Sequence, residues 1–282
     1  MVKKKVGDFT SIGIVLRKFN EEKDKYVSRE FQKYGYELAR SLGELKNRGL
    51  YIGLAKKEPR AILDKIKYEI LDSGKGGSLG KLFMWKLGQY HWRKKLEESI
   101  LPFDFFDVSP IQGAKQLLGR ILVSVDEYGM LRAGKIIETE AYLGEKDLAS
   151  HARFGLEGKG GIMFDRPGRA YVYLIYGQHR MFNVVIHRSG KAGAVLIRSL
   201  KPLIGGKGRL GVGPGKLTNW LKISQSDNGR DLTKGEKIWL AKGEAVSKEK
   251  TSCGERVGID YAEKWAEKKW RFWIKYTRYK SG

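Results

Sequence analysis

The chain has 282 residues, of which 55 are Lys or Arg and 32 are Asp or Glu, so its formal net charge is +23; this length holds one or two domains. Hydrophobic residues make up 41% of the chain and 7 residues are Trp, which is enough for a packed core and excludes a wholly disordered protein. The basic excess favours a polyanionic partner, most often nucleic acid, although a basic proteome or a need for solubility would give the same balance.

The N-terminal part of the chain has a helical pattern from about Val27 to Ser99. The first expected helix has apolar residues at three- and four-residue steps, namely Phe31, Tyr34, Leu38, Leu42 and Leu45. A second helix is expected after Pro59 and a third from Leu79 to Glu98, with a glycine-rich loop between them. Ile100–Pro102 marks the expected boundary. The pattern predicts a basic α-helical module of unknown role over residues 1–100 and a second domain over residues 103–282.

The second domain mixes helix and strand patterns. Residues 115–123 predict the end of a helix that runs into a strand. Short segments rich in β-branched and aromatic residues, bounded by Gly or Pro, predict strands at Gly134–Leu143, Ala170–Tyr176, Met181–His187 and Ala194–Leu200. Residues 203–215 hold six glycines and predict a loop, and Leu217–Ile223 predicts a short helix.

The expected strand within Lys135–Gly144 carries carboxylates at alternate positions. Since side chains alternate faces in a strand, one face would carry Ile136, Glu138, Glu140 and Tyr142. The other face, which suits a core, would carry Ile137, Thr139, Ala141 and Leu143. This alternation is equally typical of a solvated sheet edge. The functional interpretation is a carboxylate that accepts a proton from water beside an aromatic ring.

Two expected strands flank Gly177 and predict a hairpin with Tyr176 at its tip. A tyrosine at a hairpin tip is not expected to contribute to a hydrophobic core, whereas a protruding aromatic ring can insert between bases. Tyr171 and Tyr173 share one strand face, and ordinary strand tyrosines are equally compatible with that pattern.

The segment Gly211–Lys216 resembles a phosphate-binding loop only superficially. Position 210 is Leu where a Walker motif needs Gly, and position 217 is Leu where it needs Ser or Thr, so nucleotide hydrolysis is not expected. A helix entry whose amides meet a backbone phosphate stays open, with Lys216 as a DNA contact.

Two further groups of residues have structural interpretations. Arg198 ends an apolar strand, and such an arginine usually pairs with a carboxylate, for which Glu138 and Glu140 are the candidates. The aromatic residues of the basic tail are more typical of a core with snorkelling lysines than of a base-stacking platform; they are Trp265, Trp270, Phe272 and Trp273.

The single cysteine, Cys253, excludes a disulfide framework and a cysteine-based zinc site. The histidines lack close paired spacing, so no metal site is expected; they are His91, His151, His179 and His187. No apolar run approaches the roughly 20 residues of a membrane span, and the N-terminus is unlike a secretory signal. We therefore expect a soluble intracellular protein, cytoplasmic or nucleoid-associated (nuclear if eukaryotic), with no membrane contact.

Several longer segments follow one another in a fixed order from about Asp104 to Ile274: AKQLLGRILV, IIETEAYLGEKDLASHAR, MFDRPGRAYVYLIYG, FNVV, AVLIRSLKPL, GPGKL, GRDL and RVGIDYAEKWAEKKWRFWI. In these segments the chain resembles the 3-methyladenine (alkyladenine) DNA glycosylases. The resemblance implies an α+β fold around a curved, mostly antiparallel sheet, here preceded by the helical module. It also implies a monomeric enzyme that needs no cofactor and whose partner is double-stranded DNA containing damaged purines.

The activity that this resemblance implies is that of a monofunctional glycosylase in base excision repair. It would flip alkylated or deaminated purines (the 3-methyladenine, hypoxanthine and ethenoadenine class) out of the duplex and hydrolyse the N-glycosidic bond with a Glu-activated water. By resemblance, Glu140 is the general base, and Arg198 and the backbone carbonyl of Val257 help to hold the water. The pocket would be formed by Tyr142, His151 and Tyr173, with Asn183 obstructing the 2-amino group of guanine. Tyr176 would fill the gap left by the flipped nucleotide.

Two regions depart from the family pattern. The stretch Arg153–Gly161 replaces a Thr-Pro-Arg-Asn-like segment on the pocket and DNA side. Gln178 and His179, expected DNA contacts with Lys216, follow the wedge where the family varies. Residues 1–100 have no counterpart in the family: they could extend the DNA footprint, recruit a repair protein or be a fused neighbour, and we favour the first.

Two alternatives from other functional classes stay open. One is a non-catalytic nucleic-acid-binding module of the same fold, against which the intact set Glu140, Arg198, Tyr142, His151 and Tyr173 speaks. The other is that the N-terminal module carries the main function as a protein-interaction domain.

Overall fold

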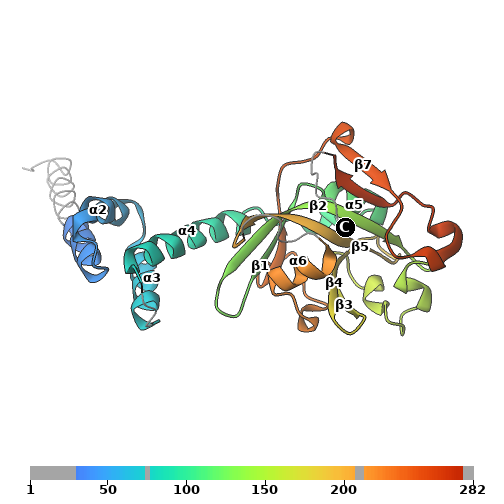
Figure 1. Cartoon of the computed structure of the whole chain (residues 1–282), viewed down its shortest axis with the longest axis horizontal. Coiled ribbons are helices and arrows are strands. Elements are labelled where there is room, and N and C mark those ends of the chain that lie inside the picture. The colour runs from blue at the N-terminus through green and yellow to red at the C-terminus, as the bar shows by residue number, and fades with distance from the viewer. Residues whose placement is uncertain (1–29, 74–76, 207–212, 276–282) are drawn as a thin grey trace, which may run out of the picture. The chain divides into compact units, whose positions relative to one another are not determined.

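The computed structural model describes residues 30–73, 77–206 and 213–275 of the chain (Figure 1). The chain divides into two compact units between His91 and Trp92, and this division falls within the helix α4 (Leu79–Glu97). The separate roles expected for residues 1–100 and 103–282 stay predictions.

The first unit is helical in its described part. Residues 30–41 form a helix, which is followed by η1 (Leu45–Asn47), α2 (Arg48–Lys57), α3 (Arg60–Asp72) and the first part of α4. Their apolar faces meet around the buried side chains of Leu38, Leu63 and Phe83. No helix within the described ranges is both long and apolar enough to cross a membrane.

The helices expected after Pro59 and from Leu79 are confirmed as α3 and α4, whereas the predicted start near Val27 lies outside the described residues. The sequence pattern does not predict α2. This helix contains Gly49 and Gly53 and buries only Tyr51, so no apolar period marks it.

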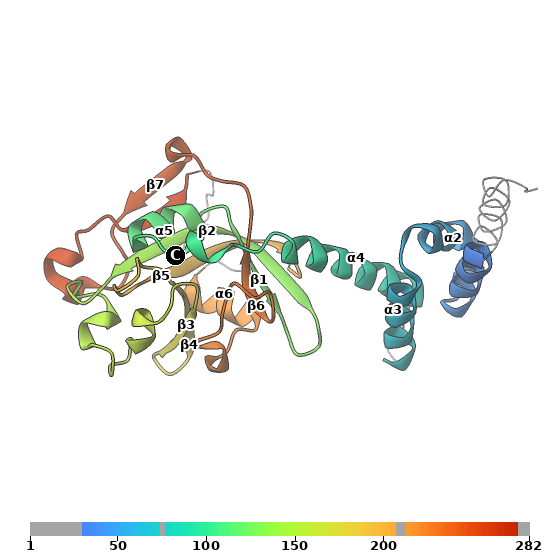
Figure 2. The same ribbon diagram turned by 180° about the vertical axis from the view of Figure 1, so that it is seen from behind.

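The second unit is built on an antiparallel sheet (Figures 1 and 2). In the described part, six strands pair in the order β3-β4-β5-β2-β1-β6, while β8 pairs with both β2 and β7. The strands are β1 (Ile121–Val125), β2 (Leu131–Leu143), β3 (Ala170–Ile175), β4 (His179–Val185), β5 (Gly193–Ile204), β6 (Ile238–Ala241), β7 (Thr251–Gly254) and β8 (Arg271–Ile274). The α-helices are α5 (Pro110–Leu117) and α6 (Pro214–Leu221). The short 3-10 helices are η2 (Phe103–Phe105), η3 (His151–Phe154), η4 (Gly161–Phe164), η5 (Gln225–Asp227), η6 (Lys248–Lys250) and η7 (Asp260–Trp265). The predicted α+β class, with a helical N-terminal part, is confirmed.

A β-bulge changes the predicted alternation of β2. The pairing with β5 passes from Ile136↔Leu200 to Glu138↔Ser199, which leaves Ile137 as an extra residue. Ile136 therefore belongs to the main hydrophobic core, and its predicted place on the carboxylate face is wrong. Beyond the bulge the alternation holds, because Thr139 is buried and donates its hydroxyl to the carbonyl of Ala114 at 2.8 Å.

The main core lies where α5 and α6 pack against the sheet. The Ser109 side chain accepts from the backbone of Gln112 and Pro110 occupies the first turn, both typical of a helix start. From the C-terminal segment, Phe272 is buried in this core and Trp270 packs against it. The ammonium of Lys115 lies 5.2 Å from the centre of the Phe272 ring. The core interpretation is confirmed for Phe272 and Trp270. Trp265 packs against a smaller cluster, and Trp273 belongs to no hydrophobic cluster of the described residues.

Several predicted element boundaries shift by a few residues. β3 ends at Ile175 instead of Tyr176, and β4 spans His179–Val185 instead of Met181–His187. β5 continues to Ile204, which shortens the predicted loop. Helix α6 spans Pro214–Leu221 instead of Leu217–Ile223. It begins at Pro214 because the fixed φ of proline suits the first helical position. Gly211 and Val212 of the loop motif lie outside the described residues.

Candidate functional site

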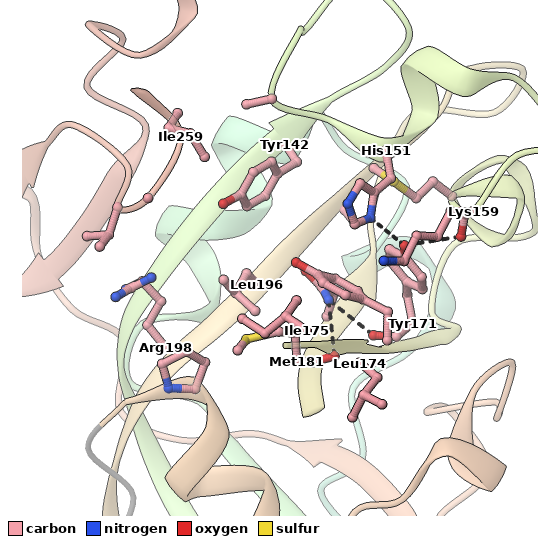
Figure 3. A pocket seen from close by; sticks show the side chains of 18 of the residues that line it. Tyr142, His151, Lys159, Tyr171, Leu174, Ile175, Met181, Leu196, Arg198 and Ile259 are labelled. Carbon is pink, nitrogen blue, oxygen red and sulfur yellow. Dashed lines mark hydrogen bonds between the residues drawn. The ribbon is translucent and has the colours of Figure 1, made fainter. Parts of the chain in front are cut away.

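A pocket of about 520 Å³ opens in the second unit. It is lined from β2 by Tyr142, from η3 by His151, from β3 by Tyr171 and Tyr173, from β4 by Asn183, from β5 by Leu196 and Arg198, and from the segment after Arg256 by Val257, Ile259 and Tyr261. Figure 3 shows Lys159 beside His151, and Arg198 across the space from these two residues. The pocket brings together the predicted residues of four strands and two loops.

Glu140 is fully buried and does not itself line this pocket, but its three polar partners Tyr142, Arg198 and Val257 do. Its Oε1 accepts a hydrogen bond from the backbone N–H of Val257 at 2.9 Å, and its Oε2 accepts one from the Tyr142 hydroxyl at 2.9 Å. Nη1 of Arg198 is 3.3 Å from Oε1. This environment excludes the solvated-edge interpretation of β2 for Glu140, and the three donors fix the orientation of its carboxyl group.

Arg198 bridges the two carboxylates of β2. Its Nε lies 3.2 Å from Oε1 of Glu138, in addition to its contact with Glu140. Arg271 also reaches Glu138, at 3.2 Å. The prediction that Arg198 pairs with a carboxylate of this strand is confirmed for both candidates. Glu138 therefore pairs with both arginines, whereas Glu140 contacts Arg198 and the pocket residues Tyr142 and Val257.

The burial of Glu140 has an electrostatic consequence. Loss of hydration raises the pKa of its carboxyl group, although Arg198, the Val257 amide and the Tyr142 hydroxyl oppose the rise. Burial acts to lower the pKa of Arg198, but Glu140 and Glu138 outweigh it and the pKa is raised. Burial and Glu140 both raise the pKa of Tyr142, which keeps its phenol protonated as a donor. A carboxyl group with a raised pKa is a better proton acceptor at neutral pH.

Aromatic rings form the opposite wall of the pocket. The ring centres of His151 and Tyr173 are 4.7 Å apart, and those of Tyr171 and Tyr173 are 5.1 Å apart. Tyr171 is a pocket residue that the family roles above do not include. The predicted grouping of Tyr142, His151 and Tyr173 around one space is present, and such a set of rings suits a flat heteroaromatic ligand.

A hydrogen-bond chain fixes the His151 ring. The Tyr171 hydroxyl donates to the backbone carbonyl of Lys159 at 3.2 Å and lies 2.7 Å from Nδ1 of His151. The Tyr171 hydroxyl therefore ties the His151 ring to the backbone at Lys159. Burial, followed by the charges of Lys159 and Arg153, lowers the pKa of His151 to about 4. The imidazole is therefore neutral at physiological pH.

Asn183 is buried at the floor of the pocket. Its side-chain amide donates to the carbonyl oxygens of Tyr171 at 3.2 Å and Met181 at 3.4 Å. Because both contacts belong to the paired strands β3 and β4, the side chain is held in one orientation.

The tip of the β3–β4 hairpin projects at the edge of the pocket. Tyr176 is 88% exposed, and its backbone has a φ of 49°, followed by 66° at Gly177. Gln178 and His179 are exposed beside it, and the His179 ring lies against Gly215 in the first turn of α6. Lys216 is exposed on that same turn. The structure thus gathers the residues predicted to contact DNA on one surface next to the pocket.

Val257 contacts Glu140 through its amide, whereas its expected contribution was its carbonyl, and that role for the carbonyl stays a prediction. Support for Val257 comes from Arg256, a residue to which the sequence reasoning gave no role. Arg256 and Asp147 form a fully buried ion pair at 2.7 Å. The Arg256 guanidinium also lies 4.8 Å from the Tyr142 ring centre and donates to the carbonyl of Ala141. Both residues fall in segments quoted above, RVGID and GEKDLAS, which are the only sequence signal for them.

Comparisons with known proteins agree on one family. The sequence profile described as methylpurine-DNA glycosylase (MPG) matches residues 104–278. The chain is 42% identical over 182 residues to a protein named "Putative 3-methyladenine DNA glycosylase" from Myxococcus xanthus (strain DK1622), which covers 64% of this chain and 93% of that protein. A protein of the same name from Methanocella arvoryzae is 39% identical over 188 residues, covering 62% of this chain and 92% of its own length. The family match begins at residue 104, so it leaves the helical first unit out.

Proposed function

Because the chain belongs to the methylpurine-DNA glycosylase family, we propose that it flips alkylated or deaminated purines from duplex DNA and hydrolyses their N-glycosidic bond with a water activated by Glu140. Membership of this family makes the chain a DNA-3-methyladenine glycosylase, a hydrolase that acts in DNA base excision repair. The observation that carries the mechanism is the buried carboxyl group of Glu140, which accepts hydrogen bonds from Val257 and Tyr142, two residues that line the aromatic pocket.

In this mechanism Glu140 accepts a proton from a water molecule as the water oxygen attacks C1′ of the deoxyribose. The bond between C1′ and the base nitrogen breaks, its electron pair leaves with the base, and an abasic sugar remains. Arg198 stabilises the ionised carboxylate before the proton is taken. The raised pKa of Glu140 supports this role, because a general base works best with a pKa close to the operating pH.

The aromatic pocket would hold the flipped purine between Tyr142 on one side and His151 and Tyr173 on the other. Stacking on such rings tolerates different purines. Asn183, held by two carbonyl groups, would obstruct the 2-amino group of an undamaged guanine. Selection would therefore depend on shape at the pocket floor and on stacking at its walls.

The hairpin surface would contact the duplex around the flipped nucleotide. Tyr176 would enter the gap in the base stack, and Gln178, His179 and Lys216 would contact the neighbouring backbone. Flipping costs a few kcal/mol, least where the base pair is already damaged. Phosphate contacts from the basic surface would offset that cost.

We also propose that the first unit extends the DNA footprint. Residues 1–91 carry 20 Lys and Arg against 11 Asp and Glu. A monomer with both units on one duplex would then bind more phosphates than the second unit by itself.

The activity is tested with 25–30 base-pair duplexes that each carry one lesion: 7-methylguanine, hypoxanthine or 1,N6-ethenoadenine. The expected product is an abasic site, detected by alkaline strand cleavage, with no strand cleavage before alkali. A protein that binds these duplexes but releases no base from any of them would instead be a non-catalytic DNA-binding module of the same fold.

A further inference from the structure

The segment between η3 and η4, which departs from the family pattern, brings a lysine to the rim of the pocket. Lys159 lines the pocket together with His151 and Tyr173. Its ammonium group lies 5.6 Å from the centre of the Tyr173 ring, within the range of a cation–π contact. The role of this lysine is not part of the mechanism above.

The backbone of this segment is held close to His151. The backbone carbonyl of Lys159 accepts a hydrogen bond from the Tyr171 hydroxyl. A Cβ on Gly160 would lie 2.6 Å from the backbone carbonyl carbon of His151, so only glycine fits there. The side chain of Lys159 is exposed. Its backbone is held next to the pocket by these two contacts.

The charge of Lys159 is not balanced by its surroundings. Among the described residues that line the pocket, none is Asp or Glu, and the formal cations are Lys159 and Arg198. Arg198 is paired with Glu138 and Glu140. Lys159 makes no ion pair within the part of the chain that the structure describes. The pocket thus has a neutralised cation, Arg198, and a cation without an ion-pair partner among the described residues, Lys159, which lie on opposite sides of it in Figure 3.

The effect of this charge reaches the aromatic wall. After burial, Lys159 is the largest cause that lowers the pKa of His151. The Lys159 ammonium thus disfavours a positive charge on the His151 ring. It would also repel a positive charge on a bound base, because the base would stack against the same aromatic rings.

We propose that Lys159 makes this pocket favour uncharged lesions, such as hypoxanthine and ethenoadenine, over cationic ones, such as 7-methylguanine and 3-methyladenine. The inference rests on the proposed function and adds the substrate class. A cationic purine would compete with the Lys159 ammonium for the Tyr173 ring and would be repelled by it. An uncharged purine instead gains negative charge as it takes the electron pair of the N-glycosidic bond, and a nearby ammonium stabilises that charge.

The test compares two lesions in one sequence context. The single-turnover excision rate constant is measured for 7-methylguanine and for hypoxanthine. The unaltered full-length protein is compared with its Lys159→Gln and Lys159→Glu variants. We expect Lys159→Gln to raise the ratio of 7-methylguanine to hypoxanthine excision about fivefold, as for the loss of one partly solvated charge. Lys159→Glu should raise the ratio further. Lys146→Gln removes the same charge from an exposed position of the second unit outside the pocket, and it should leave the ratio unchanged.

An unchanged ratio in Lys159→Gln would overturn the inference while the proposed function stands. An equal fall for both lesions would also overturn it, because that result assigns Lys159 to a DNA phosphate. If the unaltered protein releases neither base, the proposed function fails and this inference fails with it.

Discussion

The amide N–H of Val257 lies 2.9 Å from Oε1 of Glu140, although 117 residues separate the two in the chain. The contact exists because β8 pairs with β2 next to Glu140, through Glu140↔Arg271, and the segment before β8 folds over the pocket. Arg256, immediately before Val257, is fixed by Asp147 in the loop after β2. The position of the buried carboxyl group thus depends on two segments far apart in sequence.

Replacement of the buried carboxyl group tests its role as the base. We expect Glu140→Gln to lower the single-turnover excision rate by about 10²- to 10⁴-fold, because an amide cannot take the proton from water. Binding of the lesion duplex should be retained in a gel-shift titration. Glu138→Gln is the matched control on the same strand face, since Glu138 also pairs with Arg198. Equal losses in the two variants would contradict the assignment to Glu140.

The Arg256–Asp147 pair should matter for both stability and rate. Both side chains are fully buried, so Arg256→Met leaves Asp147 without a counter-charge. We expect the free energy of unfolding in urea to fall by about 3–5 kcal/mol. The double variant Arg256→Met, Asp147→Leu should recover much of this loss, because it buries no lone charge.

The same two variants separate stability from positioning. In the double variant, kcat should stay reduced while KM changes little. The Tyr142 ring no longer packs on a guanidinium, and the Arg256–Asp147 ion pair no longer fixes the backbone next to Val257. Full recovery of kcat along with stability would show that Arg256 has no positioning role.

The excision rate should depend on pH through Glu140. Only the ionised carboxylate can accept a proton, so the rate falls as pH decreases through its pKa. Since burial raises this pKa above the ordinary 4.5, the acid limb of the pH–rate profile should lie above pH 4.5. His151, with a pKa of about 4, is neutral throughout this limb and should not contribute to it. If the acid limb of the pH–rate profile shifts in the His151→Gln variant, the titrating group is the histidine instead.

The exposed tyrosine of the hairpin should affect base flipping and not folding. Tyr176 is 88% exposed, so Tyr176→Ala should change the free energy of unfolding by less than about 0.5 kcal/mol. Excision should slow for a paired lesion and slow less for a lesion in single-stranded DNA, where no gap needs filling. Tyr128 is a matched control, since it is 82% exposed and lies outside the pocket. A Tyr128→Ala variant with the same loss would contradict the wedge role.

The basic first unit should increase the salt dependence of DNA binding. We expect residues 92–282, which are the whole second unit, to bind undamaged duplex more weakly than the full chain, with a shallower slope of log Kd against log salt. Each phosphate contact that is lost should reduce the slope by about 0.9. Fluorescence anisotropy between 50 and 200 mM salt measures both quantities. Equal affinity and equal slope would leave the first unit without a role in DNA binding, and a protein partner would then be the better explanation.

Local patterns were sufficient to predict much of this protein. Strand alternation places Glu138, Glu140 and Tyr142 on one face of β2, and a turn at Gly177 places Tyr176 at a hairpin tip. An arginine that ends an apolar strand predicts a carboxylate partner, as found for Arg198. These features follow from residues close together in the chain, because strand periodicity and turn chemistry are local.

The sequence by itself therefore determined the helical first part, the strands of the hairpin and of its neighbours, the carboxylate face and the exposed tyrosine. Only the tertiary structure decided that Glu140 is fully buried, that the bulge at Ile137 turns Ile136 into the core, and that Lys159 stands at the rim of the pocket. The physical reason is that burial, pKa and strand register depend on partners such as Val257 and Arg198. These partners come from separate strands and loops, and no periodicity within β2 encodes which of them will face Glu140.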